Sequence, residues 1–202
     1  GTDADAVFDR DLAVDCDALV PQITWGTSPQ HETGIDGRVP DPVRETDAGR
    51  RQSMERALEY MDLRPGAPLL GLPISAAFIG SCTNSRLSDL RTAAAVLKGR
   101  KVAGHVRAIC VPGSSQVKLA AEREGLDRIF REAGFEWRES GCSMCFYAGG
   151  ESFGDRERVV TSTNRNFENR QGPRTRSHLA SPATVAASAI AGSLADVRRL
   201  RG

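Results

Sequence analysis

Apolar side chains recur along most of this chain at the two spacings that distinguish helices from strands. Between residues 51 and 63 they stand at Met54, Ala57, Leu58 and Met61, the spacing of one helix face. Further helices are predicted from Ser114 or Ser115 to about residue 124, and at residues 87–97, 126–133 and 182–191. Short apolar runs bounded by turn residues predict strands at residues 76–79, 105–111, 135–138 and 159–161.

The first seventy residues have a different pattern. A short strand is predicted at residues 8–14, and an apolar pair, Ile23 and Trp25, runs into a turn. Residues 33–47 are rich in Gly, Pro, Asp and Arg without apolar periodicity, which predicts an extended surface connection. We therefore divide the chain into residues 1–70, a segment that packs on the main domain, and residues 71–202, the main domain itself.

The main domain alternates strand, loop and helix, and only residues 162–178 form a long polar loop. This alternation predicts an α/β fold with a parallel or mixed sheet and helices on both faces. In such sheets ligands bind at the carboxyl ends of the strands. Two cysteine-containing loops follow predicted strands, so both are expected at that edge.

Composition excludes several classes of function. The chain is 40% hydrophobic and 26% charged, with a net charge of +1, so neither nucleic acid nor an anionic membrane is an expected partner. No apolar run reaches the roughly 18–20 residues that a membrane helix needs. Five scattered cysteines do not make a disulfide framework; they fit a reducing, cytoplasmic setting in which some thiols bind metal.

Three of these cysteines suggest a metal site. Cys142 and Cys145 form a C-x-x-C between Gly141 and Phe146, and Cys82 follows Gly80-Ser81 in a separate loop. Three thiolates on a four-iron cluster would leave one iron open, as catalytic zinc sites keep an open position. Two alternatives remain: a structural zinc site with His178 or Cys110 as a fourth ligand, and a Cys142–Cys145 dithiol redox centre. Cys16 and Cys110 are expected to be buried core residues.

Four motifs, in order, resemble the aconitase superfamily. They are FIGSCTNS at residues 78–85, VPGS at residues 111–114, GCSMC at residues 141–145 and NRNF at residues 164–167. The resemblance covers almost the whole chain, and residues 23–27 and 36–42 are closer to the isopropylmalate dehydratase large subunits than to aconitase. It implies a three-layer α/β/α domain that forms the C-terminal, cluster-ligating part of a longer subunit.

The resemblance also implies a chemistry. Cys82, Cys142 and Cys145 would hold a [4Fe-4S] cluster in a hydro-lyase that isomerises 2- and 3-isopropylmalate, in leucine biosynthesis, by removing and re-adding water. Asn164, Arg165 and Arg170 would contact the carboxylates of this dicarboxylate substrate. Asn84 would bond to the cluster or the substrate. From composition alone, the basic loop that holds both arginines would instead be an ordinary solvated surface.

Departures from the family pattern leave the alkyl group of the substrate open. Glycine is usual at Asn169 and at Arg174-Thr175, and residues 146–150 replace a Leu-rich run. Homoaconitase or another alkylmalate dehydratase is therefore an alternative, as is a non-catalytic zinc domain of the same fold. The family's catalytic serine lies on a small, swivelling subunit, the expected partner, so no catalytic residue is assigned and the fragment alone is expected to be inactive.

Overall fold

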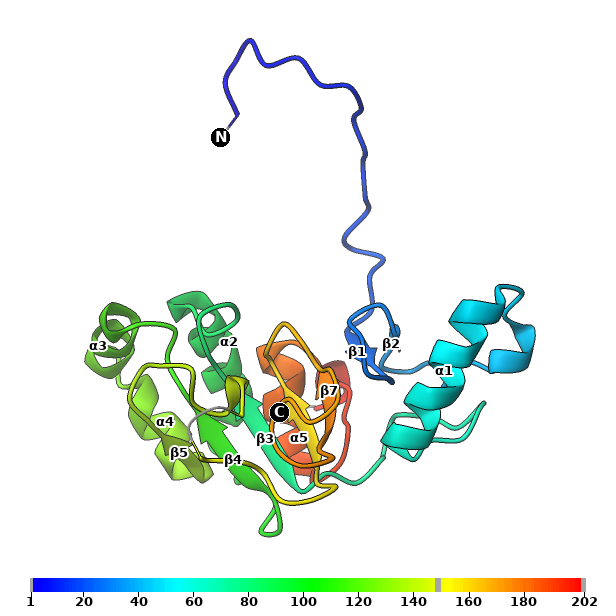
Figure 1. Ribbon diagram of the computed structural model, residues 1–202. Coiled ribbons are helices and arrows are strands. Elements are labelled where there is room, and N and C mark those ends of the chain that lie inside the picture. Colours follow the sequence, from blue (N-terminus) through cyan, green and yellow to red (C-terminus); the bar gives the residue numbers. More distant parts are fainter. Residues whose placement is uncertain (1, 148–149, 201–202) are drawn as a thin grey trace.

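Figure 1 shows the computed structural model, which describes residues 2–147 and 150–200. Its main sheet contains five parallel strands in the order β5-β4-β3-β6-β7. Their bounds are β3 (Ala76–Ile79), β4 (Arg107–Cys110), β5 (Phe135–Trp137), β6 (Arg158–Thr161) and β7 (Arg176–Leu179). A separate antiparallel pair consists of β1 (Gln22–Thr24) and β2 (Glu32–Gly34).

The helices are α1 (Ala48–Met61), α2 (Leu87–Leu97), α3 (Ser115–Arg123), α4 (Leu126–Ala133) and α5 (Pro182–Ala191), with short 3-10 turns η1 (Pro42–Arg44), η2 (Ser143–Cys145) and η3 (Val197–Arg199). From β3 the chain builds outward through α2 to β4 and through α3 and α4 to β5. It then returns to the other side of β3 to form β6 and β7. The strand order therefore reverses between β3 and β6.

The two faces of the sheet are covered by different parts of the chain. Ala77 and Ile79 of β3 face a large core that includes side chains of α2, α4 and α5, whereas Ala76 and Phe78 face a smaller cluster. Because parallel crossovers are right-handed, the return from β5 to β6 passes over this second face. It covers that face with Met144 and Phe153, and no α-helix of the described residues contributes there. The predicted α/β class and parallel sheet are confirmed. The expectation of helices on both faces was wrong for the described residues, because the return from β5 to β6 covers the second face with loop residues and η2 instead of an α-helix.

Helix bounds follow the sequence closely. The structure reproduces the predicted bounds of α2, α4 and α5. The helix predicted from residue 51 begins earlier, at Ala48, because the Asp47 carboxylate accepts a hydrogen bond from the Arg50 N–H at 2.7 Å and caps it. The sequence left the start of α3 open between Ser114 and Ser115; in the structure Ser114 is the cap, since its hydroxyl accepts from the Val117 N–H at 3.2 Å.

Four further sequence-based expectations were wrong. Residues 8–14 form no strand, because nothing in the described chain pairs with them and Val7 and Leu12 are exposed. Cys16 lies in the same exposed segment rather than in the core. Residues 33–47 are partly core, since Ile35 and Val39 are buried. The loop predicted to extend to residue 178 contains the start of β7, a polar strand that forms by pairing with β6.

Residues 22–70 share their packing with the sheet domain. Ile23, Trp25 and Ile35 belong to the same hydrophobic cluster as Ala77 and the helices. The Asn166 amide, after β6, donates hydrogen bonds to the Thr24 hydroxyl (3.2 Å) and to the Gly26 carbonyl (2.6 Å). The division at residue 70 stays a prediction. None of the helices in the described ranges has the length and apolarity needed to cross a membrane.

Candidate functional site

The predicted site loops all leave the same edge of the sheet. Cys82 follows β3, Gly113 follows β4, Cys142 follows β5 and Asn164 follows β6. Because these strands are parallel, their carboxyl ends lie together, and the strand order reverses between β3 and β6. Crevices at such a reversal are where doubly wound sheets bind ligands. The topology therefore supports the location that the sequence predicted.

Hydrogen bonds tie the Cys82 loop to its neighbours. The Ser162 hydroxyl, after β6, donates to the Gly80 carbonyl at 3.1 Å, and the Asn84 amide donates to the Ser162 carbonyl at 2.8 Å. On the other side, the Gly113 N–H donates to the Ser85 carbonyl at 2.9 Å. A Cβ at Gly113 would lie only 2.9 Å from that same oxygen, so glycine permits the close approach.

The C-x-x-C loop is anchored through its middle. Cys142 and Cys145 bracket η2, and Met144 between them is buried in the smaller core cluster with Phe78. The buried Gln171 amide donates to the Met144 carbonyl at 2.8 Å and accepts from the Ser177 hydroxyl at 2.7 Å. Sequence reasoning did not single out Gln171, because a glutamine in a polar loop gives no signal of burial.

Arg170, which was predicted to bind substrate, contacts Cys145, which was predicted to bind the cluster. Its guanidinium donates to the Cys145 sulfur at 3.2 Å. The guanidinium carbon also lies 5.1 Å from the ring centroid of Phe167 and 6.0 Å from that of Phe146. Arg170 therefore joins the C-x-x-C loop to the loop that holds Asn164.

The other predicted substrate residues are at the same edge but make different contacts. Asn164 and Arg165 are exposed, and the Arg165 guanidinium donates to the Asn164 carbonyl at 2.9 Å. The Asn84 amide is engaged with Ser162, so in this structure it holds two loops together. A cavity of about 460 Å³ beside it is lined by Asn84, Thr163 and residues of β1 and of the start of α5.

Cys82, Cys142 and Cys145 have the thiol chemistry that an iron–sulfur cluster needs, although their side chains are not grouped as a metal site in this structure. Cys82 and Cys142 are exposed free thiols and Cys145 is half-buried. Across residues 2–147 and 150–200, no three His, Cys, Asp or Glu side chains are grouped so as to hold a metal ion. Buried polar atoms without a partner nevertheless occur at Ser85, at Ser143 and at Nε of Arg170. Buried donors normally have acceptors, so these positions suit a group with acceptor atoms at the cysteine loops.

The fourth ligands considered for zinc do not lie at this site. His178 is fully buried; its Nδ1 lies 2.7 Å from the Thr24 carbonyl and its Nε2 lies 2.9 Å from the Arg158 guanidinium. Cys110 is buried in β4, where burial raises the pKa of its thiol well above the ordinary value. The prediction that Cys110 is a core residue is confirmed.

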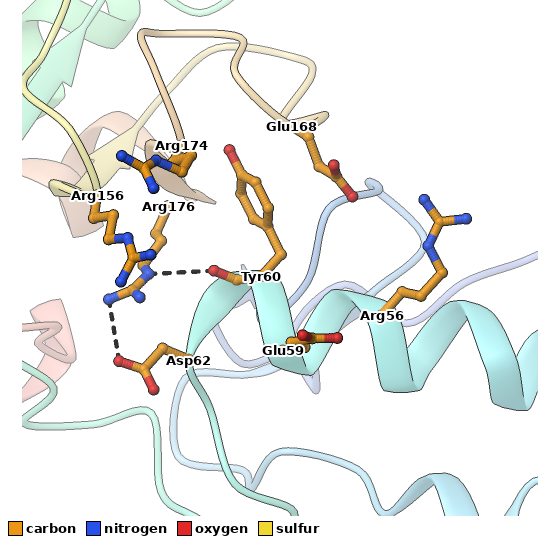
Figure 2. Close-up of a pocket in the computed structure, with 8 residues that line it drawn as sticks. All are labelled: Arg56, Glu59, Tyr60, Asp62, Arg156, Glu168, Arg174 and Arg176. Carbon is orange, nitrogen blue, oxygen red and sulfur yellow. Dashed lines mark hydrogen bonds and ion pairs between the residues drawn. The ribbon is translucent and has the colours of Figure 1, made fainter.

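A second charged pocket lies away from the cysteine loops. Its volume is about 500 Å³. Figure 2 shows the side chains that line it, between the end of α1 and the segments before β6 and β7. Arg176, at the amino end of β7, is paired with Asp62 at 3.2 Å and donates to the Tyr60 carbonyl at 3.2 Å. None of the predicted site residues lines this pocket.

Comparison with known proteins identifies the class. Residues 1–192 match the model of the aconitase family (aconitate hydratase). The chain therefore belongs to the aconitase family, which confirms the resemblance seen in the motifs.

Three curated relatives have similar names. The chain is 72% identical over 201 residues to the 3-isopropylmalate dehydratase large subunit of Cupriavidus necator, covering 100% of this chain and 75% of that relative. It is 59% identical over 199 residues to 3-isopropylmalate dehydratase large subunit 1 of Bradyrhizobium diazoefficiens, covering 98% of this chain and 42% of the relative. It is 56% identical over 201 residues to the large subunit of Roseiflexus castenholzii, covering 100% and 43%. The chain thus spans less than half the length of two of these relatives.

Proposed function

We propose that this chain is the cluster-ligating part of a hydro-lyase that interconverts 2- and 3-isopropylmalate by loss and re-addition of water. Family membership and the names of its relatives support this activity. The observation that carries it is the contact between Arg170 and Cys145 at 3.2 Å. This contact supports the proposal because a guanidinium suits a carboxylate and a thiol suits a metal, and the two meet at the carboxyl edge of a parallel sheet.

In this proposal Cys82, Cys142 and Cys145 hold a [4Fe-4S] cluster. When bound, the cluster supplies a Lewis acid that makes the substrate hydroxyl a better leaving group. Arg165 and Arg170 bind the two carboxylates, because a guanidinium offers paired N–H donors that match a carboxylate. Asn164 adds a neutral donor, and Asn84 holds the Cys82 loop against Ser162. Together these residues fix the substrate so that the hydroxyl and the adjacent C–H are aligned for elimination.

The remaining components are proposed to lie outside this chain. A small subunit with a swivelling domain would supply the base that takes the proton from carbon. We propose a cytoplasmic setting, because reduced thiols are needed to bind the cluster. With a net charge of +1, nucleic acid and membranes are not proposed as partners.

The test is cluster assembly in a full-length large subunit that contains this chain. Anaerobic incubation with iron and sulfide should produce a broad visible absorption and, after one-electron reduction or oxidation, an EPR signal. Cys82→Ser should lose most of the absorption. Cys16→Ser is the matched control, since Cys16 is also an exposed free thiol but lies far from the site loops in the sequence.

Two results would contradict the proposal. Uptake of zinc without an iron–sulfur chromophore would favour the structural-domain alternative. A cluster that forms without turnover of isopropylmalate, but with turnover of a longer homologous acid, would favour homoaconitase or another alkylmalate dehydratase.

A further inference from the structure

Two phenyl rings lie exposed beside the proposed cluster site. Phe146 is 48% exposed and Phe167 is 45% exposed, whereas Phe78, Phe130 and Phe153 are fully buried. The rings of Phe146 and Phe167 come from different loops, yet their centroids are 6.3 Å apart. Together they form a small apolar surface at the carboxyl edge of the sheet.

Arg170 positions both rings. Its carbonyl accepts a hydrogen bond from the Tyr147 N–H at 2.7 Å, which fixes the backbone just after Phe146. Its own N–H donates to the Phe167 carbonyl at 3.1 Å. The guanidinium lies over both rings while it donates to Cys145. One residue therefore brings a cation, a thiol and two aromatic rings into contact.

We propose that Phe146 and Phe167 form the apolar wall that receives the alkyl branch of the substrate. This inference rests on the proposed function, in which Arg170 binds a substrate carboxylate. In an alkylmalate the branch stands within two or three bonds of the carboxylates, so a carboxylate on Arg170 places the branch within reach of these rings. A branched alkyl group loses contact with water there, which favours it over a smaller group by about 10-fold or more per carbon.

Phe146 is the better residue to vary. Its ring is farther from the Arg170 cation, at 6.0 Å, than that of Phe167, at 5.1 Å. Its exposure means that truncation should leave folding intact. Tyr147 is the matched control, because it is an adjacent aromatic residue with similar exposure, 45%, whereas the ring that lies under the Arg170 guanidinium in this loop is that of Phe146.

The experiment uses the full-length large subunit with its small subunit, reconstituted anaerobically. The kcat/KM values are compared for malates that carry an isopropyl, an ethyl or a methyl group. In Phe146→Ala the preference for isopropyl over methyl should fall by about 10-fold. Phe146→Leu should restore part of this preference, and Tyr147→Leu should leave it unchanged.

The possible outcomes test the apolar wall and the proposed function separately. A wild-type enzyme that turns over none of the three malates would refute the proposed function. If wild type is active, an unchanged isopropyl-to-methyl ratio in Phe146→Ala overturns the wall. A proportional loss on all three malates also overturns it, because that pattern would mean that Phe146 only positions Arg170.

Discussion

At the scale of single residues, the most unusual electrostatic environment is that of His178. Burial, and then the nearby Arg158 charge, lower the pKa of His178 to about 3, against a smaller raising effect of its hydrogen bond to Thr24. Arg158 is itself mostly buried, which lowers the pKa of its guanidinium to about 10, and it also donates to the Met61 carbonyl at 2.8 Å. With Arg158 donating to Nε2, the neutral ring carries its proton on Nδ1 and donates to Thr24.

This environment predicts acid sensitivity. Because the folded-state pKa of His178 is about 3 and the unfolded value is near 6.5, the unfolded chain binds one more proton between these values. The free energy of unfolding should therefore fall as the pH falls below 6.5, by up to about 1.4 kcal/mol per pH unit from this residue. Urea unfolding from pH 7 to pH 4.5 would measure it.

The comparison variant is His178→Asn, whose amide can still donate to Thr24. Its pH profile should be flatter than that of wild type, although it is less stable at pH 7. Parallel pH profiles for wild type and His178→Asn would mean that His178 is not the source of the acid sensitivity.

Gly113 gives a second residue-scale prediction. A methyl group there would meet the Ser85 carbonyl at 2.9 Å and the Ser81 carbonyl at 3.2 Å, both in the backbone of the Cys82 loop. Gly113→Ala should lower the free energy of unfolding by about 1–3 kcal/mol. It should also make Cys82 react faster with a thiol reagent. Gly104→Ala, where a Cβ meets nothing within 4 Å, should show neither effect.

The departures from the family pattern also have a residue-scale explanation. Asn169 and Arg174, where the resemblance led us to expect glycine, both have left-handed backbones, with φ of 64° and 53°. Asparagine tolerates this region well, and its side-chain oxygen accepts from the Arg174 N–H at 2.8 Å. Arg174 is further held by Asp155 at 2.6 Å. The sequence showed that these positions differ, but not which backbone conformation they must adopt.

At the scale of elements, the sequence predicted those helices and strands whose formation depends on their own residues, and missed those that depend on a distant partner. The helices carry a local signal, an apolar face at helical spacing, and α5 has in addition Pro182 in its first turn, so the bounds of α2, α4 and α5 followed from the sequence. Strand β7 has no such signal, because Arg-Ser-His-Leu is polar and becomes a strand only through its pairing with β6. The strand predicted at residues 8–14 had the right side chains, but no neighbour pairs with it in the part of the chain that the structure describes.

The cap of α5 provides the element-scale prediction. The Ser181 hydroxyl accepts a hydrogen bond from the Thr184 N–H at 3.2 Å, and α5 packs against β3 and α2. Ser181→Ala should lower the free energy of unfolding by about 1 kcal/mol, measured by urea denaturation. Ser181→Gly should cost only a few tenths of a kcal/mol, since glycine is a tolerated cap. Equal losses in the two variants would mean that the hydroxyl is not the stabilising group.

At the scale of the molecule, the sequence predicted which edge carries the site but not its contacts. Strand order and parallel pairing place the loops of Cys82, Cys142 and Asn164 at one edge, and that followed from where the cysteines stand relative to the strands. The contact of Arg170 with Cys145 depends on a loop that runs back from β6 to β7. Its path is fixed by distant residues such as Tyr60, whose hydroxyl donates to the Thr175 carbonyl at 3.0 Å.

The beginning of the chain yields the last prediction. Figure 1 shows residues 2–19 leading away from the body of the molecule. Within the described residues their hydrogen bonds are all local, such as Leu19 N–H to the Cys16 carbonyl at 3.3 Å. Val7 and Leu12 are exposed, so this segment buries little apolar surface against the body. Deleting residues 1–19 should therefore change the free energy of unfolding by no more than about 0.5 kcal/mol.

A slightly longer deletion should behave very differently. Removing residues 1–25 also removes β1, with the buried Ile23 and Trp25 and the Thr24 carbonyl that accepts from His178. The loss should be at least about 3 kcal/mol, since each large core side chain is worth several kcal/mol. Urea denaturation of the two truncated chains beside wild type makes the comparison. A large loss already in the 1–19 deletion would mean that the segment packs on the body in solution, whereas a stable 1–25 deletion would mean that β1 is dispensable to the sheet domain.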